Sequence, residues 1–247
     1  MRKSLVIARR ELGAMFGGPL AWVLCAVFAG LAGYFFYADV AFFVLFGGVN
    51  LSAGLWRYVF LDWRLVALLV TPLLTMRLVA EERKLGTLEL LWTFPVRDRE
   101  VLAGKFLAAL AAYAAMLAPT LVGPAILFAF HPFAPGPLVA GYCGLLLLGL
   151  AFIACGLAAS ALTENQITSA VLAYGVLVLA WFVSWNEAAL GEVIAPALLA
   201  LSLFDNFYGF TQGVIDGRCV VYLAAFATFF LFLAHRALGS RAWRGVS

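Results

Sequence analysis

Six apolar runs, each 18 to 25 residues long, dominate the sequence and limit the folds open to it. A helix needs about 20 apolar residues to cross the hydrocarbon core of a bilayer, so each run is long enough to span a membrane. Of the 247 residues, 65% are hydrophobic and 12% are charged, against roughly 45–50% and about 25% in soluble domains. We therefore predict an all-α membrane protein, one transmembrane domain over 1–247 with six transmembrane helices at 19–37, 63–80, 106–130, 138–162, 167–185 and 219–238.

Basic residues collect on one side of these predicted spans. Thirteen of the 16 Lys and Arg residues lie before the first span, near or within the segment joining the second and third spans, or at the end of the chain; the exceptions are Arg57, Arg64 and Arg218. Short loops rich in Lys and Arg stay in the cytoplasm. We therefore predict a multi-pass protein whose N- and C-termini are both cytoplasmic, as is the loop between spans two and three.

The first 17 residues have an amphipathic pattern. Apolar residues recur there at helical spacing, which predicts a helix over 1–17 lying on the inner membrane surface. Such a helix either anchors the first span against anionic lipid or acts as a lever between a cytoplasmic partner and the membrane. The apolar stripe consists of Met1, Leu5, Ala8, Leu12, Met15 and Phe16.

The segment from 186 to 217 is acidic and contains no Lys or Arg. Its apolar stretch from Val193 to Leu203 is too short to cross a bilayer and is interrupted by Pro196. We predict short extracytoplasmic helices here, re-entrant or interfacial, before the last span.

Local patterns add three expectations within the spans. Pro119 and Pro124 should kink the third span, either as a passive irregularity or as a moving gate. Small residues four apart, such as Gly156 and Ser160, favour close helix packing over a pore. The pattern Thr163-x-x-Gln166 is typical of a capping box that would start span five.

Patterns for catalysis are lacking in the sequence. Gly104-Lys105 is followed by Phe106, so the phosphate-binding loop motif is absent, and the four cysteines have no metal-ligand spacing. We predict no catalytic residue, no metal site, no directly bound cofactor and, at a net charge of +3, no nucleic-acid partner. The spans also hold almost no ionisable residues, which argues against an ion-coupled carrier and favours an external source of energy.

The most informative polar stretch runs from Arg77 to Lys105. Leu85, Leu88, Leu91 and Trp92 fall on one side of a predicted short helix over 81–93, which Phe94-Pro95 must end. A dense mixture of charges on such a helix suits docking into a groove of a soluble protein. The alternative is a solvated, salt-bridged loop.

This stretch resembles the ABC-2 type permeases, specifically the branch typified by the gliding-motility permease. The resemblance lies in Pro72-Leu73-Leu74-Thr75-Met76-Arg77, Glu81-Glu82-Arg83-Lys84-Leu85-Gly86-Thr87-Leu88-Glu89-Leu90-Leu91, Pro95-Val96, Gly104-Lys105-Phe106, Leu162-Thr163-Glu164-Asn165-Gln166-Ile167 and Gly213-Val214-Ile215-Asp216. It implies six spans, a bacterial inner-membrane location, a dimer of permease subunits and two cytoplasmic ABC ATPase subunits that bind ATP and Mg.

The resemblance also implies which residues contact the ATPase. The coupling helix would contribute Glu81, Glu82, Arg83, Lys84, Gly86, Thr87, Leu88, Glu89 and Leu91. A secondary cytoplasmic contact would come from Arg9, Arg10, Glu164 and Asn165.

These observations favour one function and leave others open. The first is the transmembrane permease subunit of an ATP-driven exporter, which is not itself an enzyme. The second is a mechanotransmission anchor that drives a cell-surface machine, with an auxiliary extracytoplasmic or membrane protein and without translocating a substrate. Reconstitution with the ATPase and candidate substrates would separate these two. A secondary carrier, a channel and a membrane enzyme are weaker alternatives.

Overall fold

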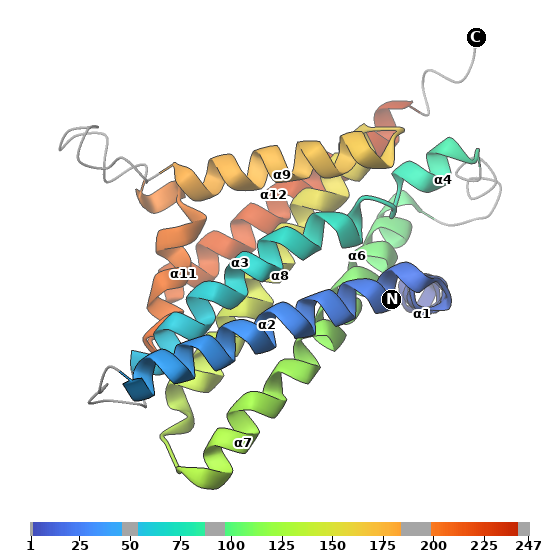
Figure 1. The fold of residues 1–247 in the computed structure, drawn as a ribbon. Coiled ribbons are helices and arrows are strands. Elements are labelled where there is room, and N and C mark those ends of the chain that lie inside the picture. Colours follow the sequence, from blue (N-terminus) through green and yellow to red (C-terminus); the bar gives the residue numbers. More distant parts are fainter. Residues whose placement is uncertain (1, 46–53, 87–96, 184–198, 242–247) are drawn as a thin grey trace.

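The computed structural model describes residues 2–45, 54–86, 97–183 and 199–241, and every regular element in these ranges is helical. Helix α1 (Arg2–Gly17) lies across one end of the bundle and is seen nearly end-on in Figure 1. Helix α2 (Pro19–Leu45) runs along the bundle, and α3 (Trp56–Thr75) returns to the α1 end, where α4 (Ala80–Lys84) follows.

The next membrane-length segment is broken at its prolines. Helix α6 (Asp98–Leu117) passes into a 3-10 helix, η2 (Ala118–Leu121), and then into α7 (Val122–Phe130). Pro119 lies in η2 and Pro124 in α7, and proline removes a backbone donor and clashes with the preceding turn. The predicted irregularity in this segment is confirmed.

Four helices complete the described chain. They are α8 (Pro135–Leu162), α9 (Gln166–Phe182), α11 (Leu203–Thr211) and α12 (Gly217–Arg241), whose C-terminal end lies at the same end of the bundle as α1 and α4 (Figure 1).

Five of the described helical segments are long and apolar enough to cross a membrane: Pro19–Leu45, Trp56–Lys84, Asp98–Phe130, Pro135–Leu162 and Gly217–Gly239. The fifth predicted span, 167–185, corresponds to the shorter apolar helix α9, which has 17 residues. The helices also extend beyond several predicted limits, for example past Asp39 in α2 and before Asp62 in α3. A helix need not end where its apolar character ends, because its backbone hydrogen bonds do not depend on side-chain polarity.

Helix α8 is the centre of the bundle and packs against α3, α6, α9, α11 and α12. Its glycines admit side chains from these neighbours, because a Cβ atom at Gly149 would overlap the Tyr113 ring and one at Gly156 would overlap Thr75. The prediction that the small residues of this segment mark close helix packing is confirmed.

This packing predicts opposite effects for two Gly→Ala substitutions. We expect Gly149→Ala to lower the free energy of unfolding by about 1–3 kcal/mol, because the added methyl group displaces the buried Tyr113 ring. Gly175→Ala in α9 meets no atom within 4 Å and should stabilise the helix by about 0.5–1 kcal/mol. Thermal unfolding of both variants in one detergent tests this, and equal shifts in midpoint would contradict the packing of α8.

The opposite end of the bundle contains α11, within the predicted segment 186–217. Ser202 caps this helix by accepting a hydrogen bond from the Asp205 backbone N–H at 3.3 Å. The buried Phe207 and Phe210 face α8 at Gly144. Residues 186–198 of the predicted segment lie outside the described residues.

Candidate functional site

A serine of α8 holds the turn that connects α3 to α4. The Ser160 hydroxyl accepts hydrogen bonds from the backbone N–H groups of Val79 and Ala80, both at 3.0 Å, and donates to the Met76 carbonyl at 3.1 Å. Helix α4 has no side-chain cap of its own at Val79. Ser160 therefore satisfies the first free donors of α4 from another helix, where a local cap would normally do so.

The other end of α4 is also attached to α8. Arg83 donates from Nη1 to the carbonyls of Ala161, at 2.8 Å, and Thr163, at 3.3 Å. These carbonyls belong to the C-terminal end of α8, where a cation is favoured by the helix dipole. Both ends of α4 are thus fixed to the end of one membrane-length helix.

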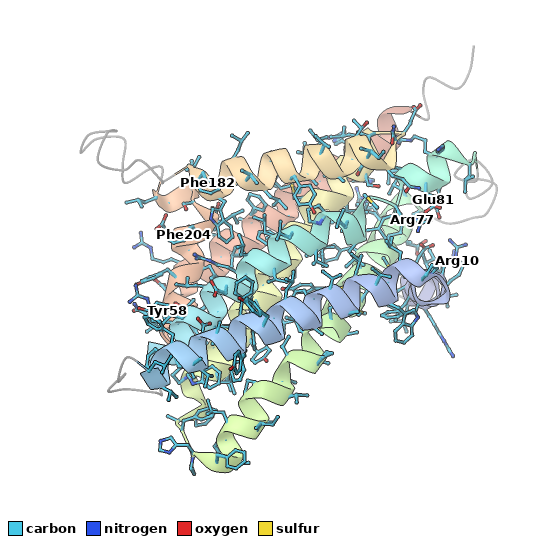
Figure 2. All side chains as sticks on the ribbon, in the orientation of Figure 1. Arg10, Tyr58, Arg77, Glu81, Phe182 and Phe204 are labelled. Atoms are coloured by element: carbon cyan, nitrogen blue, oxygen red, sulfur yellow. The ribbon has the colours of Figure 1, made fainter. Side chains whose placement is uncertain are left out.

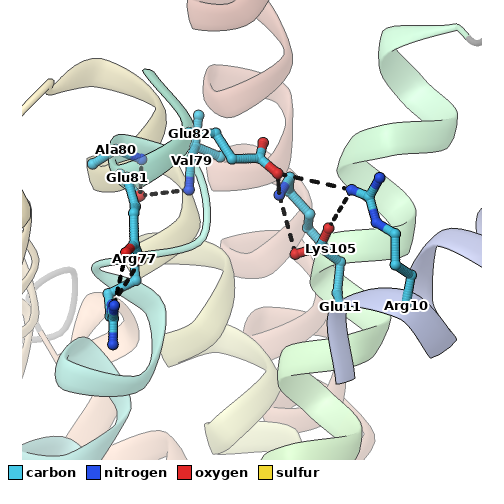
Figure 3. Close-up of polar contacts among 9 residues, drawn as sticks. Arg10, Glu11, Arg77, Val79, Ala80, Glu81, Glu82 and Lys105 are labelled. Carbon is cyan, nitrogen blue, oxygen red and sulfur yellow. Dashed lines mark hydrogen bonds and ion pairs between the residues drawn. The ribbon is translucent and has the colours of Figure 1, made fainter. Parts of the chain in front are cut away.

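A buried lysine connects α4 to two further helices (Figure 3). The Lys105 side chain on α6 is 1% exposed, and its Nζ atom lies 2.8 Å from Glu82 of α4 and 3.2 Å from Glu11 of α1. The Nη2 atom of Arg10 lies 2.7 Å from Oε1 of Glu11 and 3.8 Å from Oε1 of Glu82. A buried charge is tolerated when it is paired and hydrogen-bonded, so this group of four residues ties α1, α4 and α6 together.

The charges in this group reinforce each other. The hydrogen bond from Arg10 to the Glu11 carboxylate raises the pKa of the guanidinium above its ordinary value. Helix α1 also packs closely on α6, because a Cβ atom at Gly104 would overlap Ile7. The predicted N-terminal helix therefore contacts the start of α6 as well as the charged cluster.

A second ion pair lies beside this group (Figure 2). Arg77 donates from Nε and Nη2 to the two carboxylate oxygens of Glu81, each at 2.7 Å. Both side chains are partly exposed, at 42% and 32%. This pair contributes little to folding compared with the buried Lys105 group.

The described part of the predicted coupling helix differs from the expectation. Helix α4 ends at Lys84, and Gly86 has a φ of +70°, a left-handed conformation that ends a helix. The prediction of one continuous helix over 81–93 is therefore wrong, because the chain leaves the helix after Lys84, before the predicted leucine stripe begins at Leu85. Thr87, Leu88, Glu89 and Leu91 lie outside the described residues.

The predicted start of the fifth span requires one correction. The cap of α9 is Asn165, whose side chain accepts from the Ile167 backbone N–H at 2.9 Å, so the predicted capping box at Thr163 is wrong. The Thr163 hydroxyl instead donates to the Ala159 carbonyl within α8. Arg9 and Glu164 are exposed.

The sequence prediction did not place Glu11 or Lys105 in this site. It identified Ser160 only as a small packing residue and missed the hydrogen bonds of its hydroxyl. The available signal was the position of Lys105, directly before an apolar run, where a charge needs a partner from another helix. A further buried charge, Arg64 of α3, lies at the α11 end, over the rings of Phe204 at 3.8 Å and Trp181 at 4.7 Å. The described helices thus contain two buried basic side chains, Arg64 and Lys105, although the sequence led us to expect almost no ionisable residues in the spans.

The fold and the site together identify the class of this protein. A bundle with five membrane-length helices is an integral, multi-pass membrane protein, and across its described residues no group of three or more His, Cys, Asp or Glu side chains could hold a metal ion. The sequence profile described as ABC-2 family transporter protein matches residues 65–234, more than half of the chain. The chain therefore belongs to the ABC-2 transporter family and is a membrane permease subunit of an ABC transporter, which implies an ABC ATPase partner and membrane lipid. No curated protein matches the sequence.

Proposed function

We propose that this chain couples ATP hydrolysis by two separate cytoplasmic ATPase subunits to substrate export across the bacterial inner membrane. The observation that carries the proposal is the attachment of α4 to three other helices: to α8 through Ser160 and Arg83, to α6 through the Glu82–Lys105 pair, and to α1 through the Glu82–Arg10 pair. A force applied to α4 or to the segment after it is passed directly to α1, α6 and α8. ATP and Mg bind to the ATPase, and the permease supplies no catalytic group.

The proposed topology has six spans. Helix α9, with 17 residues, is about 25 Å long, and slight local thinning of the bilayer accommodates a short span. It packs along α3 and α8, as a membrane-crossing helix in this bundle would. With α9 as the fifth span, both termini lie in the cytoplasm, in agreement with the positive-inside distribution of Lys and Arg.

The proposed assembly is a dimer with a second permease subunit, of the gliding-motility branch that the sequence resembles. Helix α1 would lie on the cytoplasmic membrane surface, since its axis crosses that of α2 at one end of the bundle (Figure 1). The ATPase would contact the α4 segment, with Arg9, Arg10, Glu164 and Asn165 nearby as a secondary contact.

Charge reversal tests the docking surface. We expect Lys84→Glu combined with Glu89→Lys to abolish co-purification of the ATPase and to reduce its stimulated activity at least about tenfold, because two docking charges become repulsive. Arg83 is left unchanged, since its bonds to α8 would confound the result.

The matched control is Arg236→Glu, which reverses an exposed basic residue of α12 at the same end of the bundle. It should leave ATPase binding within about twofold of the unmodified permease. Full ATPase binding and stimulation by the double variant would refute the coupling assignment.

A further inference from the structure

A pocket of about 570 Å³ opens between α1, α2 and the α3–α4 turn. This volume lies within the range of about 300–1,000 Å³ that is typical of ligand pockets. The pocket begins at the charged group described above and extends along α2, so its two ends differ in chemistry.

The charged end of the pocket carries both signs. Arg10 and Arg77 line it together with the carboxylates of Glu11, Glu81 and Glu82. Lys105 does not line the pocket but pairs with Glu11 and Glu82, which do. The positive charges of the three basic groups therefore equal in number the negative charges of the three acidic groups. An occupant with a single sign of charge would meet repulsion from half of these groups, whereas a zwitterion would find a partner for each of its charges.

The other end of the pocket is apolar. Leu20 and Leu24 line it from α2, and Leu74 and Leu78 from the end of α3 and the turn that follows. Leu24 lies one helical turn, about 6 Å, further along α2 than Leu20. The apolar end therefore runs in the direction of the membrane-length helices, as an acyl chain does.

We propose that this pocket binds one phospholipid with an ethanolamine headgroup, from the leaflet on the α1 side. Its phosphate would accept from Arg77 or Arg10, its ammonium would donate to the carboxylates, and one acyl chain would lie along the leucines. A primary ammonium has three donors for the carboxylates, whereas a choline headgroup has none and a glycerol headgroup has no positive charge. The inference does not involve the ATPase.

The test is lipid retention by the full permease chain alone. The protein is reconstituted in vesicles of equal phosphatidylethanolamine, phosphatidylglycerol and phosphatidylcholine, extracted in mild detergent, and weighed with its bound lipid by native mass spectrometry. We expect one retained phosphatidylethanolamine per chain, favoured about tenfold over each of the other lipids, as one charge-assisted hydrogen bond provides.

Two variants and one control complete the test. Leu20→Trp fills the pocket and should abolish retention, whereas Leu31→Trp, on the same helix with an exposed side chain outside the pocket, should preserve it. Glu81→Gln, at a partly exposed residue whose ion pair with Arg77 contributes little to folding, should reduce the preference over phosphatidylglycerol. Equal retention of the three lipids, equal loss in Leu20→Trp and Leu31→Trp, or an unchanged preference in Glu81→Gln would overturn the proposal. So would an empty wild-type pocket whose filling lowers ATPase binding, since a protein segment would then be its occupant.

Discussion

Replacing Glu11 and Glu82 together with Gln is expected to lower the free energy of unfolding by about 3–5 kcal/mol. The Lys105 side chain is 1% exposed, and these two carboxylates lie 3.2 and 2.8 Å from its Nζ atom. Without them the ammonium stays buried with no opposite charge in contact, and the neutral amides of the two Gln residues do not balance its charge. Denaturant unfolding in a fixed detergent measures the loss.

A third substitution distinguishes charge from shape. Adding Lys105→Met to the double variant removes the unpaired charge and keeps an unbranched apolar side chain, so stability should return to within about 1 kcal/mol of the original protein. Replacing the partly exposed Arg77 and Glu81 with Gln should cost about 1 kcal/mol or less. If the triple variant were as unstable as the double variant, the buried ion pair would not be what holds α1, α4 and α6 together.

The long apolar helices were predictable because their signal is local. About 20 consecutive apolar residues specify a membrane-length helix without reference to the rest of the chain. The same holds for the break at Pro119, since proline acts on its own backbone. The predicted ends of the helices, which were based on side-chain polarity, were less accurate. Asp39, for example, lies within α2, beyond the predicted end of the first span.

The contacts of the site were not predictable, because they join residues far apart in the sequence. Lys105 lies 94 residues after Glu11, and Val79 lies 81 residues before Ser160. No local pattern specifies that pairing, which depends on how α1, α6 and α8 pack. The sequence pattern identified Ser160 as a small packing residue, and only the packed helices place its hydroxyl at the turn before α4.

The Ser160 contact leads to the second large effect. Ser160→Ala should weaken the attachment of α4 to α8 at the first turn of α4 without unfolding the bundle, because the backbone N–H groups of Val79 and Ala80 lose their partner, at about 1–3 kcal/mol each. A total of about 3 kcal/mol lowers the ratio of docked to undocked α4 more than a hundredfold. Hydrogen exchange of residues 76–84 should accelerate by a similar factor, and ATPase stimulation should fall with it.

Thr163→Ala is the matched control, since it also removes one hydroxyl from the end of α8. The Thr163 hydroxyl donates to Ala159 within its own helix and not to α4, so exchange at 76–84 should stay within about threefold of the original rate. Ser160→Ala would then separate two properties of the permease: an intact bundle, seen as an unchanged unfolding midpoint, and a weakly attached α4. If exchange at 76–84 were unaffected while ATPase stimulation was lost, Ser160 would act at another step. If exchange accelerated and stimulation was lost in an intact bundle, the force of the ATPase would reach the membrane helices through this hydroxyl.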